Sequence, residues 1–309
     1  MKRKLFFYCF TMFLFVCAAA YGNDEKEVRR SFSVDPGASI TLENISGNIT
    51  ITSWEGAKVE MIAVKNGKSD LFDQVEILTS ARASRLNIRT KYLNNGNNIN
   101  VSVQYDLKVP RNVVLDRIES VSGNIKISGV DGRITARTVS GRVHAVDITG
   151  RSTINSVSGN VIAGNIKGDI VAASVSGNVQ ISQIQGCVQA SSVSGSVFIE
   201  NNSPSDNDLI ASAVSGSIRF DGRLDPDGQY DIKSHSGTVT LNLPVNSNFV
   251  IDASTSTGSI KSDFDIRENE KAQKTGKAKV LAGVVGSGGP IVDLRTYSGN
   301  ILIRKTTDR

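Results

Sequence analysis

The sequence has little cysteine. Of the three cysteines in 309 residues, Cys9 and Cys17 fall within the first 22 residues, and only Cys187 lies further along the chain. Once those 22 residues are removed, a single thiol is left, so a scaffold stapled by intramolecular disulfides is excluded. For Cys187 itself, a tolerated surface thiol is a better interpretation than an intermolecular bridge.

Long apolar runs are also missing, apart from one at the N-terminus. Three basic residues precede the apolar segment 5–16, and Ala20-Tyr21-Gly22 carries the small residues of a cleavage site. Residues 1–22 are therefore predicted to be a signal peptide, which sends the mature protein to the periplasm, the cell surface or the exterior. A lipidated Cys17 is disfavoured because Val16 before it is not small. No later stretch approaches the ~20 apolar residues of a transmembrane helix.

Aromatic residues and net charge are scarce as well. Seven of the 18 aromatic residues lie in the signal segment, as do three of the 35 basic residues and none of the 30 acidic ones. The mature chain then holds 32 basic against 30 acidic residues, a net charge of +2 instead of +5. Nucleic acid is therefore not expected as a partner. So few aromatics among so much Gly, Ser and Asn do not fit a globule with one thick core.

What the sequence has instead is a repeat. Val-Ser-Gly recurs five times at 18-residue intervals up to Gly195, then related steps recur at 21-residue intervals. Similar steps surround Gly47 and Gly299. We expect the glycines to supply backbone conformations closed to residues with a Cβ, and the serine hydroxyls to bond from coil to coil. The predicted structural ladder comprises Gly47, Ser122, Gly123, Ser140, Gly141, Ser158, Gly159, Ser176, Gly177, Ser194, Gly195, Ser215, Gly216, Ser236, Gly237, Gly258, Ser298 and Gly299.

Apolar residues inside each repeat are spaced for short strands. Pairs two residues apart place two side chains on one strand face, and steps of three or four residues turn the chain onto the next strand. One repeat shows the set Val175, Val179, Ile181, Ile184, Val188 and Ala190. A unit that cannot bury its apolar face alone must stack on copies of itself. The sequence therefore predicts an all-β fold, a parallel β-solenoid (β-helix) of about ten coils with repeats of 18 to 21 residues.

The same template assigns inward positions to the residue two before each ladder glycine. Val157 and Val175 are expected in the core on this basis, as are Ile45, His235 and Tyr297. His235 is then interpreted as a buried neutral histidine bonded within its coil.

Two segments interrupt the repeat and set the expected boundaries. After the signal peptide we expect an N-terminal strand and first coil in 23–65, inserted β-hairpins that cap the rod in 66–110, and solenoid repeats in 111–264. A charged and glycine-rich loop is expected in 265–290, and a C-terminal coil in 291–309.

The order of these parts resembles a known family. The Asn44-Ile45-Ser46-Gly47 step, the Leu107-Lys108-Val109-Pro110 segment and the long Ser-Gly ladder together resemble the bacterial putative-adhesin domain family. That resemblance implies an exported β-solenoid domain of unknown function, without a catalytic motif to transfer. The long charged segment before the last coil departs from the family pattern.

The sequence offers little support for metal or hydrolytic chemistry. A calcium-binding β-roll needs a carboxylate at a fixed place in each half-repeat, and the residues after the glycines are mostly Asn, Ser and Arg. Asp206 with Asp208, and Asp225 with Asp227, lie in turn sequences where Asp bonds the backbone. His144 and His235 fall on different sides of the template. We therefore expect no cofactor, no metal and no enzyme.

One row of outward residues is the candidate contact surface. Residues between paired inward positions are expected to stack from coil to coil as His144, Ile162, Gln180, Phe198 and Arg219. An exposed aromatic on a flat, otherwise polar face suits the docking of an extended glycan or peptide. The expected function is adhesin-like binding of a cell-surface glycan or protein, or organisation of the cell envelope. The alternatives are a carbohydrate-active β-helix enzyme and a self-assembling structural rod; oligomeric state is left open.

Overall fold

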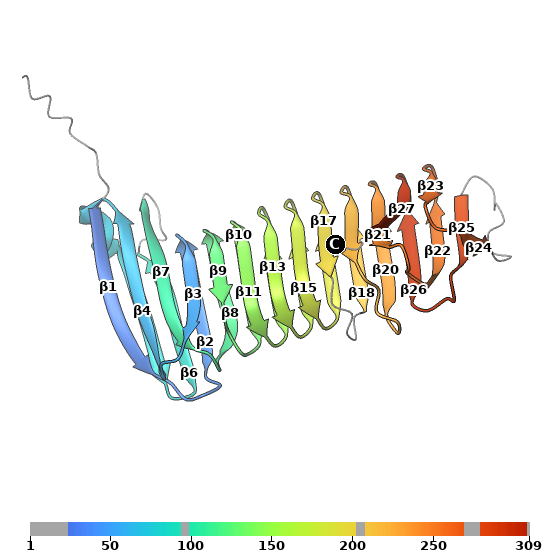
Figure 1. The fold of residues 1–309 in the computed structure, drawn as a ribbon. Coiled ribbons are helices and arrows are strands. Elements are labelled where there is room, and N and C mark those ends of the chain that lie inside the picture. The colour runs from blue at the N-terminus through green and yellow to red at the C-terminus, as the bar shows by residue number, and fades with distance from the viewer. Residues whose placement is uncertain (1–23, 94–98, 202–207, 269–278, 308–309) are drawn as a thin grey trace, which may run out of the picture.

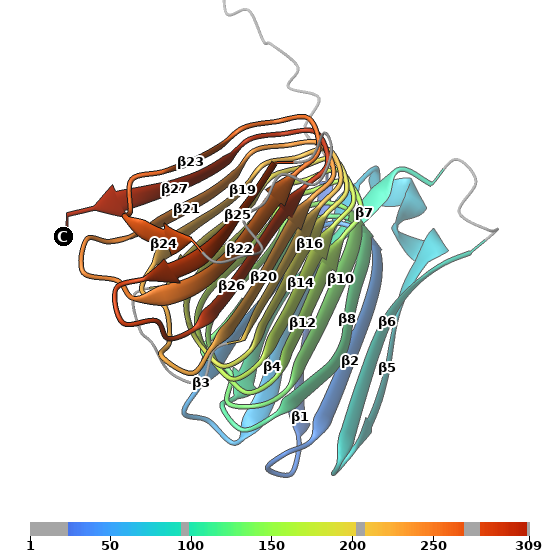
Figure 2. The same cartoon turned by 90° about the vertical axis from the view of Figure 1, so that its right-hand side faces the viewer.

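The chain forms a rod of stacked strands, seen here in a computed structural model that describes residues 24–93, 99–201, 208–268 and 279–307. Figure 1 shows the strands side by side along the rod, and Figure 2 shows the two sheets facing each other. The predicted signal peptide (1–22), with Cys17, lies outside the described residues, as does Asp206.

Sheet A has 13 strands and sheet B has 14. In spatial order, sheet A contains β1 (Asp24–Ser33), β4 (Lys58–Gly67), β7 (Val101–Pro110), β3 (Ile49–Trp54), β9 (Ile125–Ser128), β11 (Val143–Thr149), β13 (Val161–Lys167), β15 (Val179–Gln185), β17 (Val197–Asn201), β19 (Ile218–Gly222), β21 (Val239–Pro244), β27 (Ile301–Thr306) and β23 (Ile260–Ser262). Sheet B contains β24 (Ile266–Glu268), β25 (Lys279–Val285), β22 (Phe249–Thr255), β26 (Ile291–Thr296), β20 (Gln229–Ser234), β18 (Leu209–Ala213), β16 (Val188–Ser192), β14 (Ile170–Ser174), β12 (Ser152–Ser156), β10 (Ile134–Ser140), β8 (Val114–Ser122), β2 (Ser39–Ser46), β6 (Arg85–Tyr92) and β5 (Val75–Arg82).

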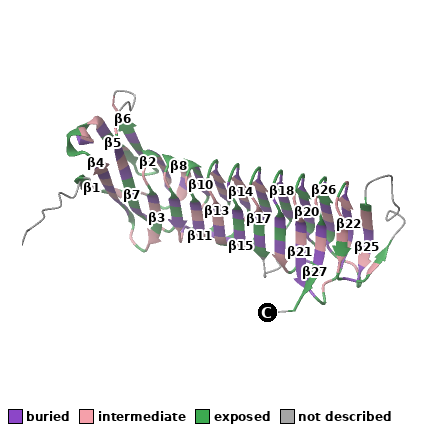
Figure 3. Cartoon of the chain, turned by 90° about the horizontal axis from the view of Figure 1, so that it is seen from above, coloured by how far each residue is buried: buried purple, intermediate pink, exposed green. Residues whose placement is uncertain are grey.

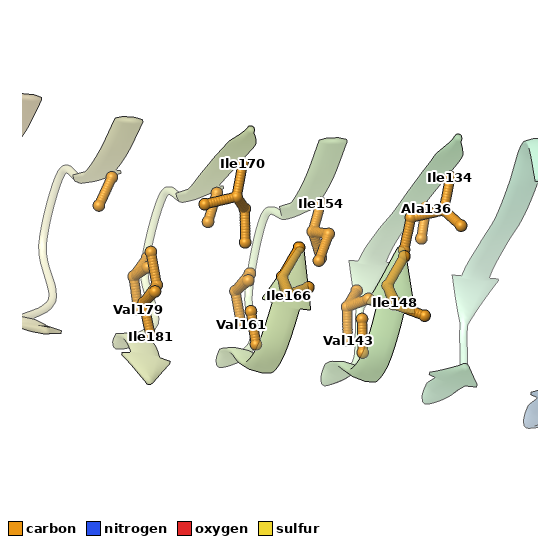
Figure 4. Packing of buried hydrophobic residues seen from close by; sticks show 14 of the residues in the cluster. Ile134, Ala136, Val143, Ile148, Ile154, Val161, Ile166, Ile170, Val179 and Ile181 are labelled. Atoms are coloured by element: carbon orange, nitrogen blue, oxygen red, sulfur yellow. The ribbon is translucent and has the colours of Figure 1, made fainter. Parts of the chain in front are cut away.

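The predicted parallel β-solenoid is confirmed. Each central coil gives one strand to each sheet, and neighbouring coils pair in parallel, as β11 pairs with β13 and β12 with β14. Side chains alternate along each strand, so every second residue is buried between the sheets (Figure 3). Figure 4 shows Ile134 and Ile154 from sheet B facing the space that Val143 and Val161 fill from sheet A.

A third buried row closes one corner of each coil. Ile148, Ile166 and Ile184 point inward although each follows a residue that interrupts the alternation. Those preceding residues adopt left-handed backbone, with φ of 55° at Asp147, 49° at Asn165 and 54° at Gln183. One left-handed residue re-aims the next side chain into the core, which explains the three-residue step in the sequence.

The residue two before each ladder glycine faces solvent, so its predicted inward position is wrong. Val157 and Val175 are 41% and 44% exposed, and Tyr297 is 58% exposed. The predicted buried His235 is exposed too, and its ring stacks on Tyr297 with centroids 5.1 Å apart. At this corner the chain turns between sheets, so a side chain points away from the core whether it is apolar or not.

A ladder of hydroxyl groups does exist, but its serine and threonine residues lie three positions before the ladder glycines, whereas the prediction placed them one position before. The predicted ladder serines such as Ser158 and Ser176 are exposed. The buried hydroxyls instead donate to a glycine carbonyl of the preceding coil, as Ser174 does to Gly159 over 2.9 Å. The equivalent donors are Thr138, Ser156, Ser192, Ser234, Thr255 and Thr296.

The ladder glycines are required mainly by close approach rather than by backbone angle. Gly177 has no left-handed φ, yet a Cβ on it would overlap the carbonyl oxygen of Gly159 in the preceding coil. Gly168, in the second half of its repeat, has a φ of +137° and would also clash with the coil before it. The expected backbone conformation is therefore found at Gly150, Gly168 and Gly186, and not at Gly132 or at most of the Ser-Gly ladder glycines.

The C-terminal coil does not lie at the end of the rod. β26 and β27 sit between the β20–β21 coil and the β22–β23 coil, so Gly299 stacks on Gly237 and Gly258 stacks on Gly299. Residues 265–290 are not simply a loop, because they contain β24 and β25, and β25 pairs antiparallel with β22. The apolar run from Val280 to Val285 forms this strand between charged and glycine-rich neighbours.

Both ends of the core are covered. The segment expected as hairpins holds the antiparallel pair β5–β6 and the strand β7, which pairs antiparallel with β4. The 3-10 helix η1 (Ser69–Gln74) buries Phe72 beside them. At the other end Phe264 is 7% exposed and packs edge-to-face on Phe249, with the Lys305 ammonium 5.2 Å from its ring centroid.

Candidate functional site

The structure brings the five predicted contact residues onto one row of the outer face of sheet A. His144 pairs in register with Ile162, Ile162 with Gln180, Gln180 with Phe198, and Phe198 with Arg219. Each lies between two buried residues of its own strand, which forces it outward. Neighbouring strands are about 4.8 Å apart, so this surface row is straight and evenly spaced.

Exposure along the row increases toward the C-terminal half. His144 and Ile162 are half-buried, whereas Gln180, Phe198 and Arg219 are exposed. Phe198 is 40% exposed, although a buried position would remove such a ring from water at a gain of roughly 1.5 to 3 kcal/mol. Phe198 is therefore the residue of this row that exposes an aromatic ring to solvent.

His144 is held neutral by its surroundings. Burial lowers the pKa of its imidazole, and the positive charges of Lys126 and Arg142 lower it further. Lys126 is its register partner on β9. Lys126 and Arg142 therefore place fixed positive charge beside the N-terminal half of the row, and the lowered pKa of His144 disfavours a further positive charge there.

A shallow hollow of about 230 Å³ surrounds Phe198. Its polar lining comes from Gln180, Ser182, Glu200, Arg219 and Asp221. The Arg219 Nε donates to Asp221 Oδ2 over 2.7 Å, and Asn242 Nδ2 donates to the other oxygen of the same carboxylate. A second hollow shares Glu200, Arg219 and Asp221 and continues toward Lys305 and Thr306. The outer face of sheet A is thus indented along β15 to β27.

The sequence-based reading missed Glu200 and Asp221. Both lie two residues after a predicted contact residue, on the same strand face, and they pair in register with each other. Strand alternation alone could have placed them beside Phe198 and Arg219. Over the ranges that the structure describes, no hydrogen bond or ion pair to Glu200 is found.

Sheet B carries a row of related composition on the opposite outer face. Val171, Gln189 and Ile210 lie in register on β14, β16 and β18, as Ile162, Gln180 and Phe198 do on sheet A. Ile210 is 51% exposed. The residues two positions further on are Ser191 and Ser212, so this row has no aromatic ring at the place of Phe198 and no carboxylate at the place of Glu200. Asp231 and Lys233 stand at the places of Arg219 and Asp221.

An exposed apolar edge runs along one corner of the rod. It consists of Ile45, Val121, Val139, Val157, Val175, Val193 and Val214, which are 41% to 50% exposed. His235 and Tyr297 continue this edge toward the C-terminal end. At its N-terminal end, Ile45, Val121 and Val139 line a hollow of about 300 Å³, whose charged lining includes Glu43, Arg89, Glu119 and Arg137.

The described residues give little support for a metal site or a catalytic site. No group of three or more His, Cys, Asp or Glu residues that could hold a metal ion is found among the described residues. Asp225 and Asp227 lie in a turn, where the Asp227 N–H donates to Asp225 Oδ1 over 3.1 Å, as the turn interpretation expects. Cys187 is a free, exposed thiol. Within the described ranges, no helix is both long and apolar enough to cross a membrane.

Comparison with known proteins gives one family and several distant structures. The model of the family Toastrack DUF4097 matches residues 18–304. No curated protein matches the chain. A putative lipid binding protein from Parabacteroides distasonis is 16% identical, with 92% of this chain and 98% of that chain covered and a TM-score of 0.44. A putative adhesin from Bacteroides fragilis is 13% identical, with coverage of 90% and 97% and a TM-score of 0.38. A putative adhesin from Parabacteroides merdae is 8% identical, with coverage of 91% and 97% and a TM-score of 0.28.

Proposed function

Since the chain belongs to the Toastrack DUF4097 family, whose model spans nearly all of it, we propose that it is an exported, non-enzymatic binding protein of the cell envelope or cell surface. Its partner is an extended cell-surface molecule, a glycan or a protein, that lies along the outer face of sheet A. The observation that carries this proposal is the in-register row from His144 to Arg219, with exposed Phe198 in a polar hollow.

The shape of the face supports an extended partner over a small enclosed ligand. Strands β11 to β19 place one outward residue per coil at a constant spacing of about 4.8 Å, so a linear polymer can meet several coils at once. Each contact with a shallow surface is weak, and affinity then comes from several contacts that bind together.

An enzyme is a weaker proposal, although two carboxylates lie in the hollow. Asp221 is occupied by Arg219 and Asn242, and Glu200 is exposed. Glycoside hydrolysis needs one carboxylic acid with a raised pKa and a second carboxylate across the scissile bond, usually away from bulk water. A shallow hollow on a flat face gives no means of excluding water.

A self-assembling rod is also less well supported. End-to-end stacking requires open apolar ends, and Phe72 and Phe264 are buried at the two ends of this core. The outermost strand of sheet A, β1, carries charge at most of its first seven positions (Asp24, Glu25, Lys26, Glu27, Arg29 and Arg30). A charged edge strand opposes the addition of another sheet.

The proposal is tested by surface binding of paired variants. The Ile162→Ser/Phe198→Ser double variant removes the apolar residues of the sheet A row, and Val171→Ser/Ile210→Ser makes the matched change on sheet B. Fluorescently tagged mature protein is applied to bacterial and host-cell surfaces, after melting curves confirm that both variants fold. We expect the sheet A variant to lose most of its binding and the sheet B variant to keep it. Equal binding by both would refute sheet A as the contact face.

A further inference from the structure

We infer that the hollow around Phe198 binds a sugar unit of a neutral, hydroxyl-rich glycan. This inference rests on the proposed function and specifies the chemistry of its partner. It comes from four features of the hollow: an exposed ring, a set of hydrogen-bonding groups of mixed type, the balance of charge, and the contrast with the equivalent place on sheet B.

The ring gives the hollow an apolar platform. Phe198 lies on β17 between its register partners Gln180 and Arg219, so polar groups flank it on both neighbouring strands. Side chains on a sheet stand roughly perpendicular to it, which leaves the Phe198 side chain exposed to solvent. A sugar ring has one face made largely of C–H groups, and such a face packs against an aromatic ring while the hydroxyls at its rim stay polar.

The polar groups match a ligand with many hydroxyls. The Gln180 amide donates and accepts, the Ser182 hydroxyl does both, and the carboxylates of Glu200 and Asp221 accept. A carboxylate has two oxygens and can accept from two neighbouring hydroxyls, in hydrogen bonds strengthened by its charge. Asp221 is already oriented by Arg219 and Asn242, so little side-chain entropy is lost when it binds.

The charge of the hollow selects against acidic glycans. Arg219 is paired with Asp221, and this leaves Glu200 as the uncompensated charge beside Phe198. Glu200 is the register partner of Asp221 on the adjacent strand, so a ligand carboxylate here would meet the uncompensated negative charge of Glu200 beside a carboxylate that already holds Arg219. The fixed positive charges are those of Lys126, on β9, and of Arg142, just before β11, and β13 lies between β11 and β15. A neutral sugar is not repelled by the Glu200 carboxylate, and it brings no charge that would need a partner in the hollow.

The equivalent place on sheet B serves as an internal comparison. Gln189 and Ile210 stand where Gln180 and Phe198 stand, but Ser191 and Ser212 occupy the places of Ser182 and Glu200. Ile210→Phe therefore introduces on sheet B only the aromatic ring of the Phe198 hollow, and Ile210→Phe/Ser212→Glu introduces both the ring and a carboxylate at the place of Glu200. Both changes fall on exposed positions, where substitutions usually change stability by less than about 0.5 kcal/mol.

The test is direct binding of defined oligosaccharides to the full mature chain. Linear neutral oligosaccharides, their uronic-acid counterparts and their amino-sugar counterparts are presented at equal density on an array, and hits are measured in solution by calorimetry. We expect binding to neutral members, a loss of about tenfold or more in Phe198→Ala and Glu200→Ala, and no more than about twofold in Ile210→Ala. In Glu200→Gln, discrimination against uronic-acid glycans should weaken.

The outcomes separate this inference from the proposed function. If mature protein binds cell surfaces but no glycan of the array, the glycan inference fails and the proposed function stands with a protein partner. Preference for amino-sugar or uronic-acid glycans likewise overturns the neutral class. If the Ile162→Ser/Phe198→Ser variant binds surfaces as well as its parent, both fail.

Discussion

The hydroxyl of Ser174 donates a 2.9 Å hydrogen bond to the carbonyl oxygen of Gly159, one coil earlier along the rod. The Ser174 Oγ in turn accepts a hydrogen bond from the N–H of Gly177 over 2.9 Å. A buried serine thus joins two consecutive glycine steps, and the bond recurs along the solenoid with Ser or Thr. This linkage joins the glycine corners of successive coils and supports the register of the strands that follow them.

Removal of that hydroxyl should destabilise the fold. In Ser174→Ala the Gly159 carbonyl and the Gly177 N–H lose their side-chain partner in a buried setting, so we expect a loss of about 1 to 3 kcal/mol in the free energy of unfolding. Urea denaturation measures it. Ser176→Ala, at an exposed serine, is the control and should change little. Ala213 occupies the ladder position in its own coil, so Ala213→Ser should be neutral or stabilising. Equal losses for Ser174→Ala and Ser176→Ala would contradict the assignment.

Close approach of the glycines leads to a second prediction. Gly177→Ala places a methyl group against the Gly159 carbonyl and must push two coils apart, at a cost of at least about 1 to 3 kcal/mol. Gly164 is the matched control, because the nearest atom to its added Cβ would be a side-chain oxygen, Ser182 Oγ, at 3.3 Å. Gly164→Ala should therefore melt within a few degrees of the parent. A similar loss in both variants would show that close stacking is not what selects glycine.

The exposed apolar edge should tolerate charge. Val175 is 44% exposed, so Val175→Asp is expected to change the free energy of unfolding by about 0.5 kcal/mol or less. Val179, four residues on, is fully buried, and Val179→Asp would place an unpaired carboxylate in the core at a cost of several kcal/mol. Thermal melts of the two variants compare them directly. A large loss in Val175→Asp would mean that this edge is covered in solution.

His144 should make stability fall in mildly acidic solution. Because burial, Lys126 and Arg142 lower its pKa, the unfolded chain binds the proton more readily than the folded chain. Well above pH 6.5 both states are neutral and the imidazole has no effect. As the pH falls through 6.5 toward the lowered pKa, the unfolded state gains protons first and stability decreases. His144→Gln, which introduces the residue found in this row at position 180, should reduce the drop in melting temperature between about pH 7.5 and pH 5.5. An identical drop in both proteins would count against this effect.

Most of the architecture could be read from the sequence. The 18-residue period fixed the parallel stacking, and the two-residue spacing within each half fixed which residues alternate, including the register of Ile162, Gln180 and Phe198. These features are local, since each depends on one repeat meeting an equivalent repeat. Val175 was misplaced because an apolar residue at a corner has the same spacing whether it turns in or out.

Features that depend on the pairing of segments far apart in the chain could not be predicted from the sequence. Nothing in residues 291–306 distinguishes a terminal coil from one that lies between two earlier coils, since its spacing equals theirs. The hollow was missed for another reason: the row was chosen one residue per strand, so Glu200 and Asp221 were never placed beside Phe198. The ladder serines were misassigned because Ser174 and Ser176 flank Val175 symmetrically and only the turn direction separates them.

The central claim is that sheet A, at Phe198, contacts the partner, and side-chain footprinting tests it most directly. Mature protein is exposed to hydroxyl radicals free and when bound to a cell-surface preparation, and oxidation at each residue is read by mass spectrometry. Phe198 and Ile162 should be protected on binding, whereas Ile210 on sheet B and Tyr297 at the corner should be oxidised equally in both states. Unchanged oxidation of Phe198 together with protection of Ile210 or Tyr297 would contradict the account.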